Sequence, residues 1–208
     1  YARVCTTDDV QGSAAAQFAK SIGVKSVYVL NDTETYGQGV AQAFTTEAKK
    51  IGLTVLSSGA YGDGWDKKQP SYEGLFTKIK ALNPDMVYLG GIFDNNGGQL
   101  IKDKVKVLGD NTVVKLMAPD GFTGYPDFNS MPEAQGAYLS FAGLSTELLL
   151  KIAPNGAGAK FAKAYKKTYG ADPVGSYPIY AVSAIQVILA AIARSDGTRK
   201  GVTKAIFS

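Results

Sequence analysis

The sequence predicts an α/β protein built on a doubly wound parallel sheet with helices on both faces. Three short runs rich in β-branched and aromatic residues are almost continuously apolar: residues 27–30, 86–89 and 114–117. Runs of this kind are typical of strands buried on both sides, as in a parallel sheet covered by helices. Segments with helical spacing separate them, which gives the β-α-β repeat of a right-handed, doubly wound sheet.

Periodicity, cap residues and stop residues predict the elements in order. Residues 1–7 alternate like a strand, and Asp8 and Asp9 favour the start of a helix that runs over residues 11–22 and stops at Gly23. Further strands are predicted at 26–30, 53–58, from Met86 onward and at 113–117, further helices at 36–50, 71–82 and 95–108, and a polar loop at 59–70.

The pattern changes after Asp120. Residues 125–133 contain prolines and read as irregular, and residues 136–144 form one more strand-like run. From residue 155 onward there are only helical patterns, at 160–169, 177–195 and 200–207. Helices at the end of an α/β chain without matching strands indicate that their sheet is supplied elsewhere. We therefore expect this chain to be incomplete.

Composition narrows the function. The chain has 208 residues, of which 45% are hydrophobic and 19% charged, as in ordinary globular proteins. The net charge is +4, but lysines and arginines are scattered and form no basic stripe with interleaved aromatics, so nucleic-acid binding is not expected. With one cysteine and no histidine, an internal disulfide and the Ser-His-Asp and Cys-His arrangements are excluded, and zinc is disfavoured. We predict no metal and no cofactor.

The most reactive side chains follow the apolar runs, where the loops of an open parallel sheet line the ligand crevice. Asp120 is followed by Gly121, which permits close approach, so this carboxylate could hold a cation. The alternative, equally weighted, is that Asp120 only caps a Pro-Asp-Gly turn. Tyr36 could offer its hydroxyl or ring to a ligand, against the more common alternative of an aromatic residue that anchors a helix.

The glycine patterns bear on the shape of a ligand pocket and on nucleotide binding. Gly90 and Gly91 precede Ile92 and Phe93, and Phe93 could form the wall of a side-chain pocket or pack in the core. No Gly-x-Gly-x-x-Gly follows a strand and no Gly-Lys-Ser/Thr phosphate loop is present, so nucleotide cofactors are disfavoured.

The order of motifs resembles the branched-chain amino acid receptor family, the type I periplasmic solute-binding proteins of ABC transporters that include the leucine/isoleucine/valine-binding protein. The resemblance covers nearly the whole chain, and it is the order and spacing of weak motifs that make it specific. These motifs are Arg3 with Asp-Asp-Val-Gln-Gly at 8–12, Asp-Thr-Glu-Thr-Tyr-Gly-Gln-Gly at 32–39, Asn-Pro-Asp-Met-Val-Tyr-Leu-Gly-Gly at 83–91, Gly109, Pro-Asp-Gly at 119–121, Ala-Gln-Gly at 134–136, residues 161–169 and Tyr-Ala-Val at 180–182.

The resemblance implies a two-lobed protein that closes like a hinge on a small zwitterion and does no chemistry. Residues 1–144 would form the second lobe with its hinge-crossing ends, and residues 145–208 would return to a first lobe whose sheet is missing here. Asp120 matches the acid that receives the ligand's ammonium group, and Tyr36 matches the tyrosine that lines the cleft. The full set of predicted ligand-binding residues is Asp120, Tyr36, Phe93, Ile92, Gly121 and Phe122.

Two departures from the family pattern leave the ligand open. The acid is Asp120 where the leucine-type proteins have Glu, and the Gly-Gly loop is one residue longer, with Ile92 and Phe93 in place of a more polar aromatic pair. Branched-chain amino acids are the first choice, while other amino acids, amides, urea and small aromatic or keto acids remain alternatives.

The resemblance also implies partners and a location. The expected partners are a small-molecule ligand and an ABC permease in the membrane, with the full-length protein a monomer in the periplasm or held outside the cytoplasm as a lipoprotein. A rival interpretation is the ligand-binding domain of a membrane sensor on the same fold. An enzyme is not expected, since the chain lacks histidine, metal ligands and a cofactor loop.

Overall fold

The computed structural model describes residues 1–208, and the chain divides into two compact units. The larger comprises Thr7–Ala142, and the smaller comprises Tyr1–Thr6 together with Gly143–Ser208. The larger unit contains all the strands.

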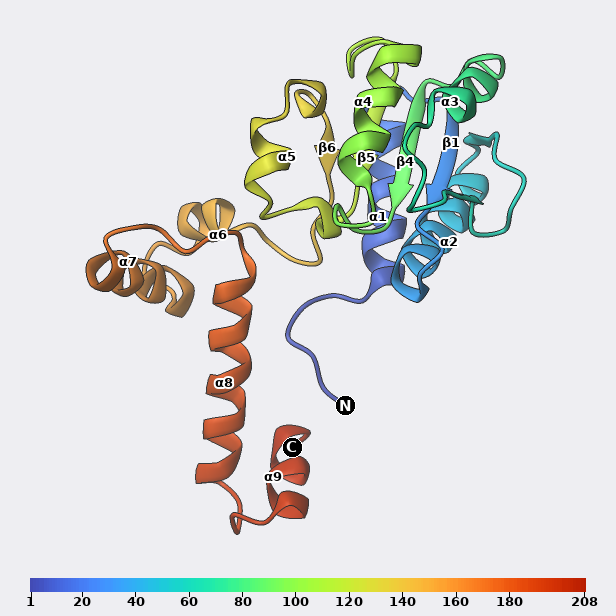
Figure 1. Ribbon diagram of the computed structural model, residues 1–208. Helices are drawn as coiled ribbons and strands as arrows, with labels where there is room; N and C mark the ends of the chain where they lie inside the picture. The colour runs from blue at the N-terminus through green and yellow to red at the C-terminus, as the bar shows by residue number, and fades with distance from the viewer. The chain divides into compact units, whose positions relative to one another are not determined.

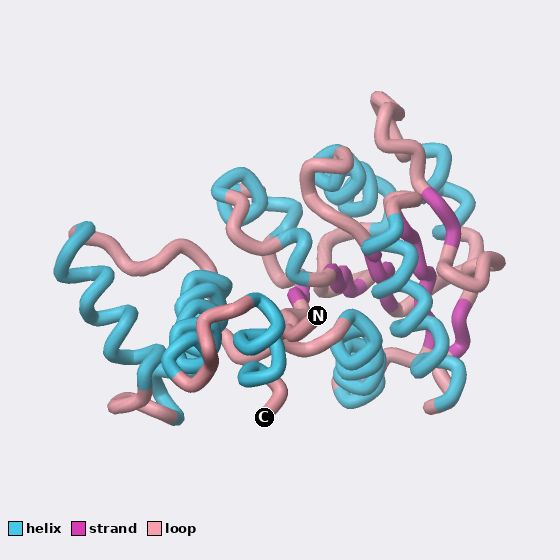
Figure 2. Tube along the Cα trace, turned by 90° about the horizontal axis from the view of Figure 1, so that it is seen from below, coloured by secondary structure: helices cyan, strands magenta, loops and turns pink.

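A six-stranded sheet forms the centre of the larger unit, and every strand pair in it is parallel (Figures 1 and 2). The order is β2-β1-β4-β5-β6, with β3 also paired to β1. The strands are β1 Ser26–Asn31, β2 Thr54–Val55, β3 Asp63–Gly64, β4 Met86–Gly90, β5 Lys115–Ala118 and β6 Tyr138–Leu139. Because all strands point the same way, the loops that follow them gather along one edge of the sheet.

Alternate strand residues are buried against helices on opposite faces, which confirms the predicted double winding. Val27, Val29 and Tyr88 belong to the core that includes α1 (Asp8–Ser21) and α2 (Thr35–Lys50). Tyr28 and Leu89 belong to the core that includes α3 (Glu73–Lys80) and α4 (Gly97–Leu108). Burial on both faces explains why these strands are continuously apolar. The shorter elements of this unit are η1 Asp120–Phe122, α5 Pro126–Ser130 and η2 Pro132–Ala134.

Helices α1 and α2 pack closely at Gly12. A Cβ atom at this position would lie 2.7 Å from the Val40 carbonyl oxygen and 2.7 Å from Ala43 Cβ. Only glycine allows this approach, and small residues at Ala15, Ala16 and Ala19 extend the contact surface of α1. The packing fixes the second turn of α1 against the middle of α2.

The structure corrects several element predictions. Residues 1–7 form no strand, and Tyr1 is 97% exposed, because no neighbouring strand supplies hydrogen-bond partners. The strands predicted at 53–58 and 136–144 shrink to two residues each in β2 and β6. The loop predicted at 59–70 contains β3, and the irregular segment at 125–133 contains α5, which begins at Pro126 in the first turn where proline is tolerated.

The smaller unit consists of helices alone: α6 Thr146–Ile152, α7 Ala157–Tyr169, α8 Tyr177–Ala193 and α9 Arg199–Ile206. The hydroxyl of Tyr180 accepts a hydrogen bond from the Leu144 amide at 2.6 Å and joins α8 to the start of this segment. Helix α8, the long orange helix in Figure 1, leaves Ile185 55% and Leu189 59% exposed. A helix that is apolar all round normally lies inside a larger protein. No helix in the structure is both long and apolar enough to cross a bilayer.

Lys104 is a fully buried cation at the end of α4. Its ammonium donates to Asn111 Oδ1 at 2.8 Å, to the carbonyl oxygens of Gly109 and Asp110 at 3.2 and 3.3 Å, and to the Val114 carbonyl oxygen. The lysine therefore satisfies the orphan carbonyls of the helix end and of the loop before β5. Burial lowers the pKa of Lys104 to about 8, although the nearby charge of Asp110 opposes this shift.

We expect the lowered pKa of Lys104 to make the free energy of unfolding depend on pH. Between about pH 8 and the ordinary lysine value, the unfolded chain binds more protons at this site than the folded chain, so stability rises with pH. From pH 7 to 9.5, the stability of the wild type relative to Lys104→Met should rise by about 2 kcal/mol in urea unfolding. Lys102→Met, at an exposed position on α4, is the control and should show no such change. A difference that is constant with pH would contradict the prediction.

Candidate functional site

The predicted site residues lie on loops at the carboxyl ends of neighbouring strands. Tyr36 is in the first turn of α2, after β1, and Ile92 follows β4. Asp120 is the first residue of η1, directly after β5. Because β1 pairs with β4 and β4 pairs with β5, these loops meet at one edge of the sheet. This is the edge at which open α/β sheets bind ligands.

The Asp120 carboxylate is the centre of the candidate site. The Tyr36 hydroxyl donates to Asp120 Oδ1 at 2.9 Å, and the Gln11 side-chain amide donates to the same oxygen at 2.6 Å. The turn after β5 is closed by main-chain atoms, since the Thr123 amide donates to the Asp120 carbonyl oxygen at 2.8 Å. The carboxylate therefore contacts α1 and α2, which is more than the turn alone requires.

Two tyrosine hydroxyls near Asp120 stay protonated. Burial, followed by the negative charge of Asp120, raises the pKa of Tyr36 far above its ordinary value. Burial, followed by the charges of Asp120 and Asp8, likewise raises the pKa of Tyr88. Tyr88 is fully buried on β4, where its ring stacks on Phe44 at 4.0 Å between centroids. Tyr36 therefore stays a hydroxyl donor to Asp120 and does not compete with it as a phenolate.

Gly121 lets the loops after β4 and β5 touch. A Cβ atom there would collide with the Gly91 carbonyl oxygen and lie 2.9 Å from Ile92 Cγ2. The Phe93 amide donates to the Gly121 carbonyl oxygen at 2.9 Å and ties the two loops together. The side chain of Ile92 therefore lies beside Gly121, the residue that follows Asp120 in the chain. In this structure the small size of Gly121 admits the loop after β4, and its close approach to a ligand stays a prediction.

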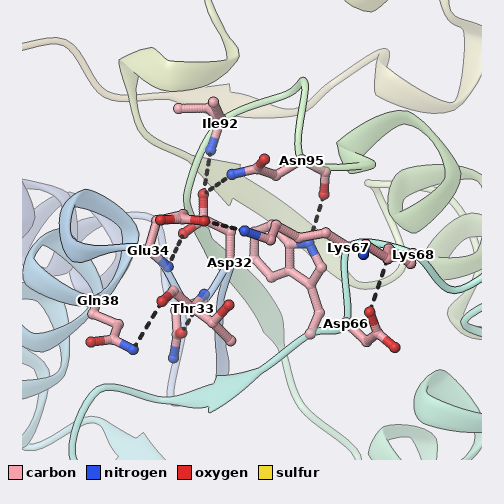
Figure 3. Close-up of polar contacts among 11 residues, drawn as sticks. Asp32, Thr33, Glu34, Gln38, Asp66, Lys67, Lys68, Ile92 and Asn95 are labelled. Carbon is pink, nitrogen blue, oxygen red and sulfur yellow. Dashed lines mark hydrogen bonds and ion pairs between the residues drawn. The ribbon is translucent and has the colours of Figure 1, made fainter.

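A second, buried carboxylate holds the loop after β4 in place (Figure 3). Asp32, 1% exposed at the end of β1, accepts hydrogen bonds from the Glu34 amide at 3.1 Å, the Ile92 amide at 3.2 Å and the Asn95 side chain at 2.7 Å. The main-chain carbonyl oxygen of Asn95 in turn accepts a hydrogen bond from the Trp65 indole at 2.8 Å. Asp32 is therefore a structural residue that fixes the position of Ile92.

The two predicted aromatic contacts do not lie at the acid. Phe122 has no exposed surface and belongs to the core on the α3 and α4 side. Phe93 is half-buried, and its ring packs against Phe122, Phe128 and Tyr125 with centroids 5.0 to 6.1 Å apart. Phe122 is thus a core residue in this structure, and its contact with a ligand stays a prediction. The ring of Phe93 packs at the rim of this aromatic core, and its role as the wall of a side-chain pocket stays a prediction.

Sequence reasoning missed three polar residues around Asp120. Gln11 is 3% exposed on α1, and its amide also lies 3.1 Å from Ser140 Oγ, just beyond β6. Tyr88 was assigned to a strand without a role. The signal for Gln11 was available, since it occupies the same helix face as the buried Ala15 and Ala19, where a polar residue is unusual.

For metals, no three Asp, Glu or Cys residues among residues 1–208 come together as a possible ligand set.

An acid and a tyrosine meet at the carboxyl edge of an open parallel sheet, which is where such sheets bind small molecules. The chain belongs to the periplasmic binding protein family, whose family model matches residues 2–207. This confirms the predicted fold class and the resemblance to type I periplasmic binding proteins of the branched-chain amino acid type.

Individual relatives agree with this membership. An amino acid binding protein of Pseudomonas aeruginosa is 27% identical over 172 residues, covering 82% of this chain and 37% of the relative. The Leu/Ile/Val-binding protein BraC3 of Rhizobium johnstonii is 33% identical over 113 residues, 54% of this chain and 29% of the relative. The crystal structure of the leucine binding protein LivK of Thermotoga maritima superposes with a TM-score of 0.79 at 23% identity, covering 98% of this chain and 55% of that one.

The chain spans only about half of that solved structure and less of the two sequence relatives. It therefore covers part of the fold that the family shares.

Proposed function

We propose that this chain is part of the non-catalytic ligand-binding component of an ABC importer, which captures an amino acid or a similar small molecule between two hinged lobes. The single observation that carries the proposal is the Asp120 carboxylate, fixed by Tyr36 and Gln11 at the carboxyl edge of the sheet. A carboxylate oriented by two donors can accept further hydrogen bonds from a ligand ammonium group.

The arrangement favours binding over chemistry. A general acid-base pair or an activated nucleophile needs a group that changes protonation near neutral pH. The Tyr36 hydroxyl beside Asp120 has a raised pKa and remains a donor, and the chain contains no histidine. Asp120 and Tyr36 therefore suit recognition of a cationic group.

Features of the smaller unit support a larger, two-lobed protein. The C-terminal half of helix α8 exposes five large apolar side chains: Ile185, Val187, Ile188, Leu189 and Ile192. We propose that a first lobe outside this chain covers them and supplies the groups that bind the ligand carboxylate. Ligand closure would then shift the population toward a state in which both lobes make contacts.

Delivery to a membrane permease and a location outside the cytoplasm as a monomer are parts of the same proposal. The rival interpretation, the ligand-binding domain of a membrane sensor, shares the site and differs in what flanks the protein. The full-length gene product decides between them, because a secretion or lipoprotein signal favours transport and a transmembrane helix favours sensing.

Isothermal titration of the full-length protein tests the ligand class. We expect submillimolar binding of one or more of L-leucine, L-valine and L-phenylalanine, with clearly weaker binding of 4-methylpentanoate and benzoate, which lack the amine. The reason is that only the amino acids place an ammonium group opposite Asp120. Tighter binding of the two acids than of any amino acid would reject the amine-recognition part of the proposal.

A further inference from the structure

Gln11 is a polar side chain in a place where stability alone does not favour one. It is 3% exposed on the face of α1 that otherwise buries alanines, and its Oε1 atom has no hydrogen-bond partner within the protein. A buried acceptor without a partner costs stability, so an apolar residue of similar shape would suit the core better. Costly buried polar groups tend to occur where function requires them.

The side-chain nitrogen of Gln11 does have hydrogen-bond partners, and it points toward Asp120. The Gln11 amide nitrogen lies 2.6 Å from Asp120 Oδ1, 3.1 Å from Ser140 Oγ and 3.3 Å from the Ser140 carbonyl oxygen. Two of these three neighbours can only accept hydrogen bonds, so the reverse orientation of the amide would set oxygen against oxygen. The amide is therefore committed to donate toward Asp120.

The same contact joins three separate elements at the carboxyl edge of the sheet. Gln11 is on α1, Asp120 follows β5 and Ser140 follows β6. The Ser140 amide also donates to the Ala118 carbonyl oxygen at 2.9 Å, which extends the pairing of β6 with β5. Asp120 is thus oriented from two sides, by Tyr36 on α2 and by Gln11 on α1.

We propose that Gln11 is a positioning residue that orients the Asp120 carboxylate for an incoming ammonium group and so sets the preference for amine-bearing ligands. This inference rests on the proposed function. Gln11 supplies no ligand contact of its own in this role. It fixes the plane of the carboxylate through Oδ1, so that a ligand need not order the side chain when it binds.

Affinity ratios in the full-length protein separate this role from a structural one. The probes are L-leucine and 4-methylpentanoate, which differ by the amine. Gln11→Met keeps the size and removes the donor, and we expect it to weaken L-leucine about tenfold with little change for the acid. In an Asp120→Asn background, the same change should cost less than about twofold, because coupled residues are non-additive. Equal losses for both probes, or additive losses, would overturn the proposal.

Gln17→Met is the matched control. Gln17 is on the same helix, and its amide also donates to a carboxylate, Glu47, at 2.9 Å, but on the side of α1 that faces α2. We expect no change in the ratio of the two affinities. If none of L-leucine, L-valine and L-phenylalanine binds to the wild type, it is the proposed function that fails, and a second measurement then decides the role of Gln11.

That second measurement needs no ligand. In ¹H–¹⁵N NMR spectra of the full-length protein, the side-chain amide signal of Gln11 is identified by its loss in Gln11→Met. Asp120→Asn should shift this signal, and Asp127→Asn, at an exposed position on α5, should leave it in place. A Gln11 signal that is unmoved by Asp120→Asn would show that the amide does not serve the acid, whatever the protein binds.

Discussion

Asp120→Asn should weaken the binding of an amine-bearing ligand by the full-length protein roughly 10- to 100-fold. The substitution keeps the size of the side chain and removes its charge, so a charge-assisted hydrogen bond of about 1.5–3 kcal/mol is lost. Tyr36 and Gln11 both donate to the present carboxylate, and an asparagine could turn its NH₂ group toward those donors, which would add to the loss. Isothermal titration with L-leucine, or with whichever amino acid binds, measures the effect.

A charge-matched control separates the site from general electrostatics. Asp127→Asn removes the same charge at an exposed position in α5 of the same unit. Its effect on affinity should stay within about twofold, because exposed charges are screened. Comparable losses for both variants would mean that net charge, rather than the geometry around Asp120, governs binding.

Asp32→Ala should lower the free energy of unfolding by roughly 3 kcal/mol, because it leaves buried donors without an acceptor. The carboxylate accepts from two main-chain amides, those of Glu34 and Ile92, and from the Asn95 side chain, and it is 1% exposed. Little water can replace these contacts. Urea unfolding followed by circular dichroism measures the change, and Asp32→Asn, which retains one acceptor oxygen, should be less destabilised.

Asp66→Ala provides the comparison for Asp32. Asp66 is exposed, and its carboxylate accepts from the Lys68 amide at 3.0 Å within its own turn. We expect a change in the free energy of unfolding of less than about 1 kcal/mol at this position. If Asp32→Ala were as mild as Asp66→Ala, the loop after β4 would have to be held by packing rather than by the buried carboxylate.

The central strands and helices were predictable because each carries a strong local pattern. The apolar runs in β1, β4 and β5 are buried on both faces, and α2 begins and ends within one residue of its predicted bounds. The failures are segments whose structure depends on a partner. Residues 1–7 alternate like a strand but have no strand beside them, and β3 exists only because its two residues pair with the end of β1.

The residues of the candidate site also divide into those with a local sequence signal and those whose role depends on distant partners. Asp120, Tyr36, Gly121 and Ile92 could be named because they stand in recognisable loops after strands. Gln11 stands on the buried helix face with Ala15 and Ala19, but its role could not be named because its partner Asp120 lies 109 positions away. Phe93 and Phe122 were given roles by their position in the chain, whereas their rings pack in the aromatic cluster with Phe128.

By itself, the sequence determined that this protein is a doubly wound α/β chain with an acid and a tyrosine at the carboxyl edge of its sheet. Periodicity and turn chemistry are local properties, so they can be recognised in the sequence without knowing which distant residues pack nearby. The contact of Gln11 with Asp120, which joins residues 109 positions apart, and the structural role of Asp32 became visible only in the folded chain. Hydrogen bonds between distant residues depend on how helices and strands pack, and no spacing along the chain records that geometry.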